Sequence, residues 1–503
     1  MQANLMIQGT MSGVGKSLLT AGLCRLFAND GFSVSPFKSQ NMALNSFVTK
    51  DGNEMGRAQA MQAEASFKEP SVLMNPILLK PTNDSQSQVI VNGKALCTLK
   101  AKEYFSWRKN LVPLILDSYK KLSEKNELIF IEGAGSPAEI NLRENDIVNM
   151  GVSRLTNAPV VLVGDIDRGG VFAQLYGTVN LLLPSERKSV KGFIINKFRG
   201  DKTLLESGLS ELERLTGIPV LGVVPYIHAE FDDEDSLAPR LLENANKHFF
   251  PATKKLDIVI IRLPHISNFT DFALLFELDF VRVRYVFSVF DLGSPDAVIL
   301  PGTKNTISDL RELKKSGLFE SILDLEKRGT FIFGICGGFQ ILGESVCDEN
   351  GVEGGGFEKG LGLLPIDTVF AVEKTLREVH AVIGKTEFDG YEIHHGNTKI
   401  KNPESKKNIK EFCTILLDSG KTEADGCMTK NVAGTYIHGI FENGKVTENF
   451  LNFLCARKGL DEKFSVRDWC EIKNERYDFL SRVLRENLDI PKLYSIMGIA
   501  EKI

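Results

Sequence analysis

The sequence of 503 residues lacks the features that mark an exported or membrane-embedded protein. It has no run of eighteen consecutive apolar residues, the length that a membrane-spanning helix needs. It has no basic amino-terminal region followed by an apolar stretch and a cleavage site. Its eight cysteines form no C-x-x-C pair and no zinc-type spacing, which favours reduced thiols. We therefore expect a cytoplasmic protein.

An excess of positive charge is also missing. Lysine and arginine number 60 against 65 acidic residues, and the net charge is −5. A protein that binds nucleic acid or an anionic membrane through its overall charge is basic, so neither partner is favoured. The composition, 43% hydrophobic and 25% charged, is that of a globular protein. Its length exceeds one usual hydrophobic core, so we expect at least two domains.

A glycine-rich loop lies between an apolar run, residues 5–8, and a segment with helical spacing, residues 18–27. A strand, loop and helix in this order direct backbone N–H groups at phosphate oxygens, while Lys16 reaches the outer phosphates and Ser17 binds magnesium. An ordinary turn is the alternative, but the flanking segments favour a nucleotide site. The loop residues expected to bind the nucleotide are Gly9, Thr10, Gly13, Val14, Gly15, Lys16 and Ser17.

Other apolar runs alternate with helical segments through the first half of the chain. This alternation predicts an α/β fold with a doubly wound, mostly parallel sheet whose ligands lie along one edge. Glu132 ends one run, where it can bind magnesium together with Ser17 or simply cap the strand. Asn196 follows a later run, where its amide can read an adenine edge. The runs are residues 33–37, 128–131, 158–164, 190–195 and 218–224.

Two polar segments each allow two interpretations. Residues 56–65 have helical composition with Gln59 and Gln62 on one face, and the residues alone favour a solvated face over ligand contacts. Residues 165–170 follow a strand and contain two acids, an arginine and two glycines. They form either a ligand-facing loop or a local ion pair.

A polar segment without clear periodicity, residues 240–255, separates the two halves of the chain. We expect a nucleotide-binding domain in residues 1–240, a linker in residues 241–255 and a second α/β domain in residues 256–503. The second domain should end in a helical segment.

The second half contains a cysteine at a sharp strand-to-helix turn, in Gly-Ile-Cys336-Gly-Gly-Phe-Gln340. A thiol at a helix N-terminus is favoured as thiolate, its nucleophilic form. His438 ends a later strand and can act as the base. A buried free cysteine and a structural histidine are the alternatives, but the pair favours a nucleophilic site.

These motifs resemble known families. Residues 334–340 and 434–441 resemble the cysteine and histidine segments of class I glutamine amidotransferases. Residues 5–17 and 128–135, with Asn196, resemble the dethiobiotin synthetase type of ATP-dependent ligase, whose loop shares the five-residue spacing between Gly9 and Gly15. Together, in this order, they resemble the cobyric acid synthase family. Further matching strings are PFKSQNMALNS, GRAQAMQAEA, DIDRGGVFAQLYGT, NKFRGD, ISNFTDF, LPGTKNTISDL and GYEIHHG.

The resemblance implies a glutamine-hydrolysing ligase that amidates the b, d, e and g carboxylates of adenosylcobyrinic acid a,c-diamide, using ATP, Mg²⁺ and L-glutamine. Cys336 would attack glutamine with His438 as base, and Gly302, Gly337 and Gln340 would bind the oxyanion or glutamine. Cobalt would belong to the corrinoid substrate, and we expect no protein-bound transition metal. The implied corrinoid contacts are Gln40, Asn41, Asn45, Arg57, Gln59, Asp165, Asp167, Arg168, Tyr391, Glu392 and His394.

One position departs from ordinary class I glutaminases. These carry a glutamate two residues after the catalytic histidine, whereas this sequence has Ile440. The departure is similar to that of the cobalamin-pathway subgroup, and the sequence does not show what orients His438. Two other functions stay open: the related ligase that forms the a,c-diamide, and a regulatory P-loop ATPase with an inert glutaminase-like domain. The oligomeric state is also open.

Overall fold

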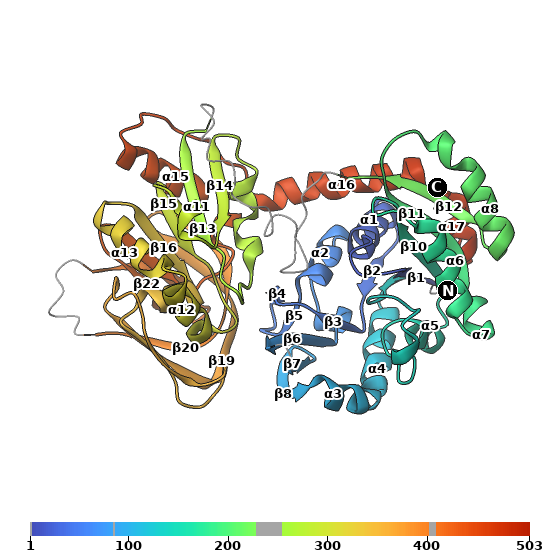
Figure 1. Ribbon diagram of the computed structural model, residues 1–503, viewed down its shortest axis with the longest axis horizontal. Coiled ribbons are helices and arrows are strands. Elements are labelled where there is room, and N and C mark those ends of the chain that lie inside the picture. The colour runs from blue at the N-terminus through green and yellow to red at the C-terminus, as the bar shows by residue number, and fades with distance from the viewer. Residues whose placement is uncertain (1–2, 84–85, 228–253, 402–408, 503) are drawn as a thin grey trace. The chain divides into compact units, whose positions relative to one another are not determined.

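The computed structural model describes residues 3–83, 86–227, 254–401 and 409–502. The chain forms two compact α/β units (Figure 1). Unit 1 comprises residues 1–43, 54–232 and 473–503, and unit 2 comprises residues 44–53 and 233–472. The mixed α/β class with a mostly parallel first sheet, predicted from the sequence, is confirmed.

The two units do not follow the chain in linear order. A short segment near the amino terminus, residues 44–53, belongs to unit 2, and the carboxyl-terminal residues 473–503 belong to unit 1. The domain boundaries expected from the sequence, at residues 240 and 256, describe a division by function and stay a prediction. Except for Lys254 and Lys255, the expected linker lies outside the described residues.

Unit 1 is built on six parallel strands in the order β12-β11-β10-β1-β9-β2. The strands match the apolar runs because a parallel sheet covered on both faces buries every side chain of its central strands. The carboxyl ends of β1, β9 and β10 therefore lie side by side, where ligands bind in such sheets. The strands are β1 (Ala3–Gly9), β2 (Val34–Phe37), β9 (Leu128–Glu132), β10 (Val160–Asp165), β11 (Val190–Phe198) and β12 (Val220–Pro225).

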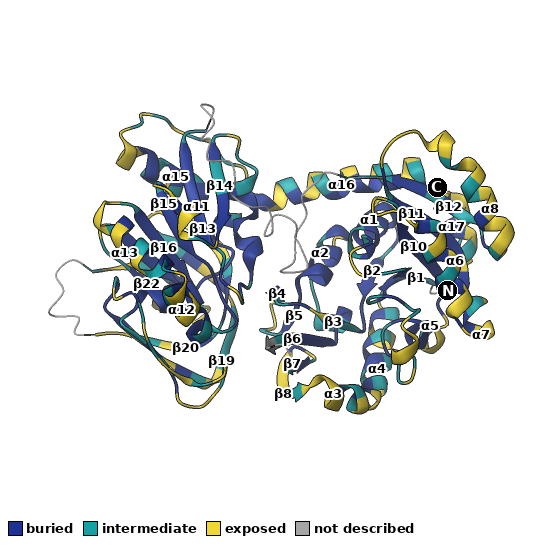
Figure 2. Ribbon diagram, viewed as in Figure 1, coloured by how far each residue is buried: buried dark blue, intermediate teal, exposed yellow. Residues whose placement is uncertain are grey.

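Most of the described helices of unit 1 lie beside this sheet, and α3 lies beside β8 of a smaller sheet (Figure 1); their buried residues are dark blue in Figure 2. A smaller four-stranded sheet, which the sequence did not predict, follows β2 in the chain. It consists of β3 (Gln40–Met42), β6 (Ile77–Asn83), β7 (Gln86–Val91) and β8 (Lys94–Lys100), and β5 (Glu54–Gly56) lies outside it. The helices are α1 (Lys16–Asn29), α2 (Arg57–Ala65), α3 (Ala101–Trp107), α4 (Val112–Ser123), α5 (Met150–Thr156), α6 (Val171–Leu181), α7 (Pro184–Arg187) and α8 (Glu206–Thr216).

Two carboxyl-terminal helices complete the core of unit 1. They are α16 (Trp469–Asn487) and α17 (Ile490–Met497). Leu480 and Leu484 of α16 are buried in the same hydrophobic cluster as α1 and β1. A Cβ atom on Gly22 of α1 would lie 2.5 Å from Leu484 Cδ1, so the glycine permits this close helix contact. Apolar packing thus assigns the end of the chain to unit 1.

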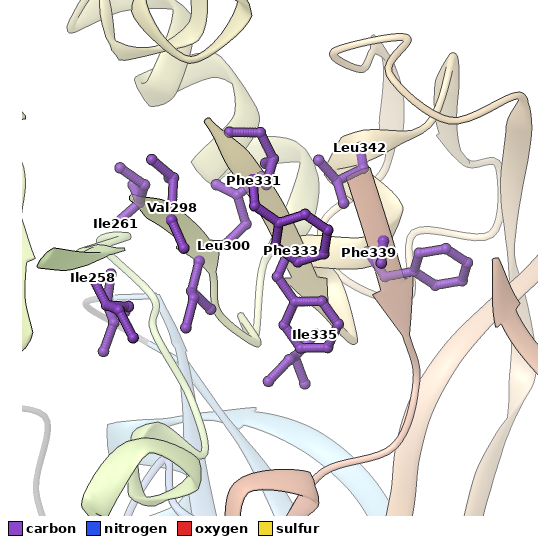
Figure 3. Packing of buried hydrophobic residues seen from close by; sticks show 14 of the residues in the cluster. Ile258, Ile261, Val298, Leu300, Phe331, Phe333, Ile335, Phe339 and Leu342 are labelled. Carbon is purple, nitrogen blue, oxygen red and sulfur yellow. The ribbon is translucent and has the colours of Figure 1, made fainter. Parts of the chain in front are cut away.

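Unit 2 contains one large mixed sheet. Five parallel strands, in the order β14-β13-β15-β16-β23, continue into antiparallel strands. Figure 3 shows the apolar side chains of β13, β15 and β16 that form its core. The strands of this sheet are β13 (Leu256–Ile261), β14 (Val281–Val286), β15 (Ala297–Leu300), β16 (Phe331–Ile335), β17 (Ser345–Asp348), β18 (Gly356–Lys359), β19 (Ile366–Ile383), β20 (Thr386–Ile400), β21 (Lys410–Leu416), β22 (Thr422–Met428) and β23 (Val432–Thr435), and β4 (Ser46–Val48) lies outside it.

The described helices of unit 2 are mostly short. They are α10 (Ala273–Phe276), α11 (Val289–Leu292), α12 (Thr306–Lys315), α13 (Leu318–Lys327), α14 (Gly337–Leu342) and α15 (Gly444–Lys458), with the 3₁₀ turns η5 (Phe269–Phe272) and η7 (Ile440–Glu442). Within the described part of the chain, no helix combines the length and the apolar composition needed to cross a bilayer.

Candidate functional site

The glycine-rich loop connects β1 to α1 in unit 1. Gly13 and Gly15 have φ values of 74° and 95°, which favour glycine, and Gly15 is the residue before α1. Asn196 donates its Nδ2 hydrogen to the carbonyl of Val14 at 2.7 Å. It lies within β11 rather than after it, so its side chain contacts the loop itself, and an adenine contact stays a prediction.

We expect the substitution Gly15→Ala to weaken ATP binding. The added methyl group would lie 2.3 Å from Asn196 Nδ2, and the left-handed backbone would be strained by about 1–3 kcal/mol. The expected results are a raised KM for ATP and a lowered melting temperature, measured by steady-state kinetics and calorimetry. Gly217→Ala is the matched control, because Gly217 also has a positive φ (68°) but no atom within 4 Å of its added Cβ. Equal effects of the two substitutions on KM would contradict this role of the loop geometry.

Lys16 and Ser17 point toward the end of β9. Lys16 Nζ donates hydrogen bonds to the carbonyl oxygens of Met11 at 3.1 Å and Gly135 at 3.2 Å. Ser17 Oγ donates to Glu132 Oε1 at 2.8 Å. The hydroxyl and the carboxylate that the sequence assigned to magnesium are therefore adjacent.

Glu132 is the centre of a buried polar cluster and is 1% exposed. Besides Ser17, its carboxylate accepts hydrogen bonds from Lys38 Nζ at 2.9 Å, Gln62 Nε2 at 2.5 Å and Gln59 Nε2 at 3.4 Å. The interpretation of α2 as a solvated polar face is wrong, because both glutamines are fully buried against this carboxylate. The sequence analysis does not assign Lys38 to the site. Its position directly after the strand of residues 34–37 is the signal that could have identified it.

The other predicted substrate contacts in the first half are divided between the two units. Gln40 accepts a hydrogen bond from the Tyr104 hydroxyl at 2.6 Å, and Asn41 Nδ2 donates to Gln59 Oε1 at 3.0 Å. Arg57 begins α2 and is 2% exposed. Asn45 is buried but belongs to unit 2, so the structure does not group it with the others.

The acids after β10 form ion pairs. Asp165 is 1% exposed and accepts from Lys197 Nζ at 2.8 Å, and the same ammonium donates to the Gly13 carbonyl at 2.6 Å. Asp167 accepts from Arg199 Nε at 3.1 Å. Of the two alternatives offered by the sequence, the structure shows the ion pairs, one of which also contacts the glycine-rich loop. A ligand-facing role stays a prediction. Arg168 is exposed.

Cys336 occupies the turn between β16 and α14 in unit 2. Its backbone has φ 51° and ψ −109°, a conformation rare for a residue with a side chain. Gly338 permits the turn, since a Cβ there would lie 1.9 Å from the Leu300 carbonyl oxygen. The cysteine is 6% exposed, and its Sγ lies 3.7 Å from the Ile393 carbonyl oxygen, to which it donates. This strained turn is typical of a nucleophile held at a sheet edge.

His438 follows β23 and lies beside Cys336. Its Nδ1 is 2.7 Å from Asp271 Oδ2, and both side chains are 1% exposed. Burial lowers the pKa of His438, but the Asp271 carboxylate and Cys336 outweigh this effect and raise the pKa to about 10. The sequence reasoning identified the string ISNFTDF but not Asp271 within it.

The predicted oxyanion residues lie close to this pair. A Cβ on Gly302 would lie 2.9 Å from His438 Cε1, and one on Gly337 would lie 3.0 Å from the backbone nitrogen of Thr303. Gln340 is buried, and its amide is already hydrogen-bonded to the hydroxyls of Thr306 at 2.9 Å and Tyr436 at 3.3 Å. Its contact with glutamine stays a prediction.

The predicted contact residues on β20, Tyr391, Glu392 and His394, have different partners. The Tyr391 ring stacks on the His438 ring, with centroids 5.2 Å apart and planes inclined by 17°. Glu392 pairs with Arg377 and lies 3.9 Å from His394 Nε2. Burial raises the pKa of Glu392, but these two partners outweigh burial and hold it below its ordinary value. The structure therefore places Tyr391, rather than Glu392 or His394, in contact with the histidine.

No group of three or more His, Cys, Asp or Glu side chains that could hold a metal ion occurs among the residues the structure describes.

Two family models match this chain. Residues 5–236 match the model of the CobQ/CobB/MinD/ParA nucleotide binding domain, and residues 257–446 match that of the CobB/CobQ-like glutamine amidotransferase domain. The fold, the two sites and these matches define a glutamine-dependent ligase with a nucleotide-binding domain.

Curated relatives narrow this class to a family. The cobyric acid synthase of Lachnoclostridium phytofermentans is 51% identical over 99% of both chains. The cobyric acid synthase of Ruminiclostridium cellulolyticum is 48% identical over 98% of this chain and 96% of its own, and that of Streptococcus sanguinis is 48% identical over 99% of both. This chain belongs to the cobyric acid synthase family, whose name places it in cobalamin biosynthesis.

Proposed function

We propose that this chain converts adenosylcobyrinic acid a,c-diamide to cobyric acid by amidating its b, d, e and g side-chain carboxylates. ATP phosphorylates each carboxylate, and ammonia released from L-glutamine displaces the phosphate. The observation that supports this proposal is the presence of both parts in one chain: the loop at Lys16 with the Glu132 cluster, and the buried Cys336–His438 pair. The names of the relatives support the choice of substrate.

In the ligase unit, the backbone N–H groups of the loop and Lys16 bind the ATP phosphates. A hydroxyl and a carboxylate are oxygen ligands that suit Mg²⁺, so Ser17 and Glu132 would hold the ion, which neutralises charge on the transferred phosphoryl group. Lys38, 2.9 Å from Glu132, brings a second ammonium to the same place. The ammonium groups of Lys16 and Lys38 would together stabilise the negative charge of the acyl phosphate.

In the glutaminase unit, the Cys336 thiol gives its proton to His438 while sulfur bonds to the amide carbon of glutamine. The tetrahedral oxyanion accepts hydrogen bonds from backbone N–H groups near Gly302 and Gly337, and each such donor contributes about 3 kcal/mol. His438 returns the proton to the leaving nitrogen, and ammonia departs. Water then hydrolyses the thioester, which releases glutamate and restores the thiol.

Mass spectrometry of the corrinoid tests this proposal. After incubation of the full chain with adenosylcobyrinic acid a,c-diamide, ATP, Mg²⁺ and L-glutamine, we expect four successive decreases of about one mass unit, because each acid hydroxyl is replaced by an amino group. Cobyrinic acid, which still carries free a and c carboxylates, is the matched control substrate. Two decreases with cobyrinic acid and none with the diamide would instead assign the chain to the a,c-diamide-forming reaction. ATP hydrolysis unaffected by any corrinoid would contradict both.

A further inference from the structure

The buried imidazole of His438 has one nitrogen hydrogen-bonded to a carboxylate from a distant part of the chain. Asp271 precedes it by 167 residues, and its Oδ2 lies 2.7 Å from His438 Nδ1. The other carboxylate oxygen, Oδ1, accepts the backbone N–H of Gly439 at 3.1 Å. Both oxygens thus contact consecutive residues in the segment that follows β23, which fixes the carboxylate relative to the imidazole.

Core packing holds the turn that carries Asp271. This residue lies in η5, which follows Asn268 with its left-handed backbone (φ 52°). The neighbouring Phe272 is fully buried, and its ring centroid is 6.3 Å from that of Phe441, three residues after His438. The backbone on both sides of the Asp271–His438 hydrogen bond is therefore anchored in one hydrophobic core.

The residue two positions after the histidine cannot perform this task. Ile440 is apolar, 1% exposed and part of the core cluster of unit 2. It offers no hydrogen-bond acceptor to an imidazole N–H. A buried ring nitrogen without an acceptor would cost free energy, and Asp271 supplies the acceptor.

We propose that Asp271 is the positioning residue of the glutaminase site: it accepts the Nδ1 hydrogen of His438 and so leaves Nε2 as the nitrogen that exchanges a proton with Cys336. The carboxylate also stabilises the imidazolium that forms when the thiol is deprotonated. In this role Asp271 acts through His438 and not directly on glutamine. This inference rests on the proposed function, in which Cys336 and His438 release ammonia.

The surroundings of His438 determine how this role depends on pH. The ionisable groups that face the ring are Asp271 from η5, Cys336 from the turn before α14, and the Tyr391 phenol, whose ring stacks on it from β20. The Cε1 edge of the ring faces Gly302, which has no side chain. Burial opposes the charged imidazole, while Asp271 and Cys336 favour it and raise the His438 pKa to about 10.

The raised pKa of His438 determines how its contribution to folding stability changes with pH. The folded pKa of His438 lies above its ordinary value of 6.5, so its contribution to folding is fully present below pH 6.5. That contribution is lost as the pH rises toward about 10. When the Asp271 carboxylate is removed, stability should therefore fall less between pH 6.5 and about 10.

The test compares Asp271→Asn with a matched control, Asp257→Asn, in the full chain. Asp257 is also a buried carboxylate of unit 2, paired with Arg284 at 2.9 Å, but it lies near the start of β13, at the opposite end of the strand from the site. We expect Asp271→Asn to lower kcat of glutamine-dependent synthesis by a hundredfold or more while ammonia-dependent synthesis stays within twofold. Asp257→Asn should leave the ratio of these two activities unchanged.

A second measurement separates positioning from folding. Iodoacetamide alkylation of Cys336, followed by peptide mapping across pH, reports the thiolate that a protonated His438 stabilises. For Asp271→Asn we expect the alkylation profile to shift to higher pH. We expect its melting temperature to be lowered near pH 6.5 and to approach that of the wild type as the pH rises toward about 10. Unchanged glutamine-dependent synthesis, or equal loss of both activities, would overturn the inference. Absence of ammonia-dependent synthesis in the wild-type chain would instead overturn the proposed function.

Discussion

Cys336→Ala should abolish glutamine-dependent synthesis, by at least about a thousandfold, and leave ammonia-dependent synthesis intact. The reason is that only the nitrogen source is lost: the substitution removes the sulfur that bonds to glutamine, whereas Lys16 and Glu132 lie in unit 1. The measurement is corrinoid amidation with L-glutamine or with ammonium chloride as the nitrogen donor.

Another buried cysteine provides the control for this substitution. Cys455 of α15 is 0% exposed and belongs to the core of the same unit, but it lies in a helix after the His438 segment. Cys455→Ala should keep glutamine-dependent synthesis, even where the small cavity lowers the melting temperature. Loss of both activities in a folded Cys336→Ala protein would contradict the proposed division of labour between the two units.

The second large effect is expected for Lys16→Ala, which should lower synthesis with either nitrogen source by at least about a hundredfold. The substitution removes the ammonium that, in the proposed function, binds the outer phosphates of ATP. No carboxylate would then be activated, and ammonia from either source would have no acyl phosphate to attack. Cys336 should keep its reactivity toward a glutamine-analogue inhibitor, because the glutaminase unit is unchanged. The measurements are corrinoid amidation and covalent labelling of Cys336.

Lys191→Ala is the control for the loss of positive charge in unit 1. Lys191 lies on β11, as Asn196 does, but its side chain is exposed and five residues away from the position that contacts the loop. Synthesis with both nitrogen sources should be unaffected. Persistent ATP-dependent amidation in Lys16→Ala would refute the assignment of the loop.

The sequence predicted the central strands of the first sheet because each is a short apolar run buried on two faces, and such a run is visible without knowledge of its neighbours. It also placed the loop residues at Gly15 and Lys16, since a phosphate-binding loop is continuous in the chain. It gave no sign of the four-stranded sheet β3-β6-β7-β8, whose short strands carry polar residues and lack a clear period.

Some residues of the candidate sites could be predicted from the sequence and others could not. Cys336 and His438 each stand at the end of an apolar strand, and β16 and β23 are paired in the sheet, so the two residues come together. Gln59 and Gln62 were misread as a solvated face, because a polar stripe on a helix looks the same whether it faces water or a buried carboxylate. Only the contact with Glu132 distinguishes the two.

The sequence by itself determined the two chemistries of this protein, since a glycine loop before a helix and a cysteine at a strand end are local patterns with local physical causes. The tertiary structure decided what surrounds them. Asp271 meets His438 across 167 residues, Lys38 meets Glu132 across 94, and α16 packs its apolar face on α1. Such contacts depend on which surfaces the folded core brings together, and no spacing in the chain encodes them.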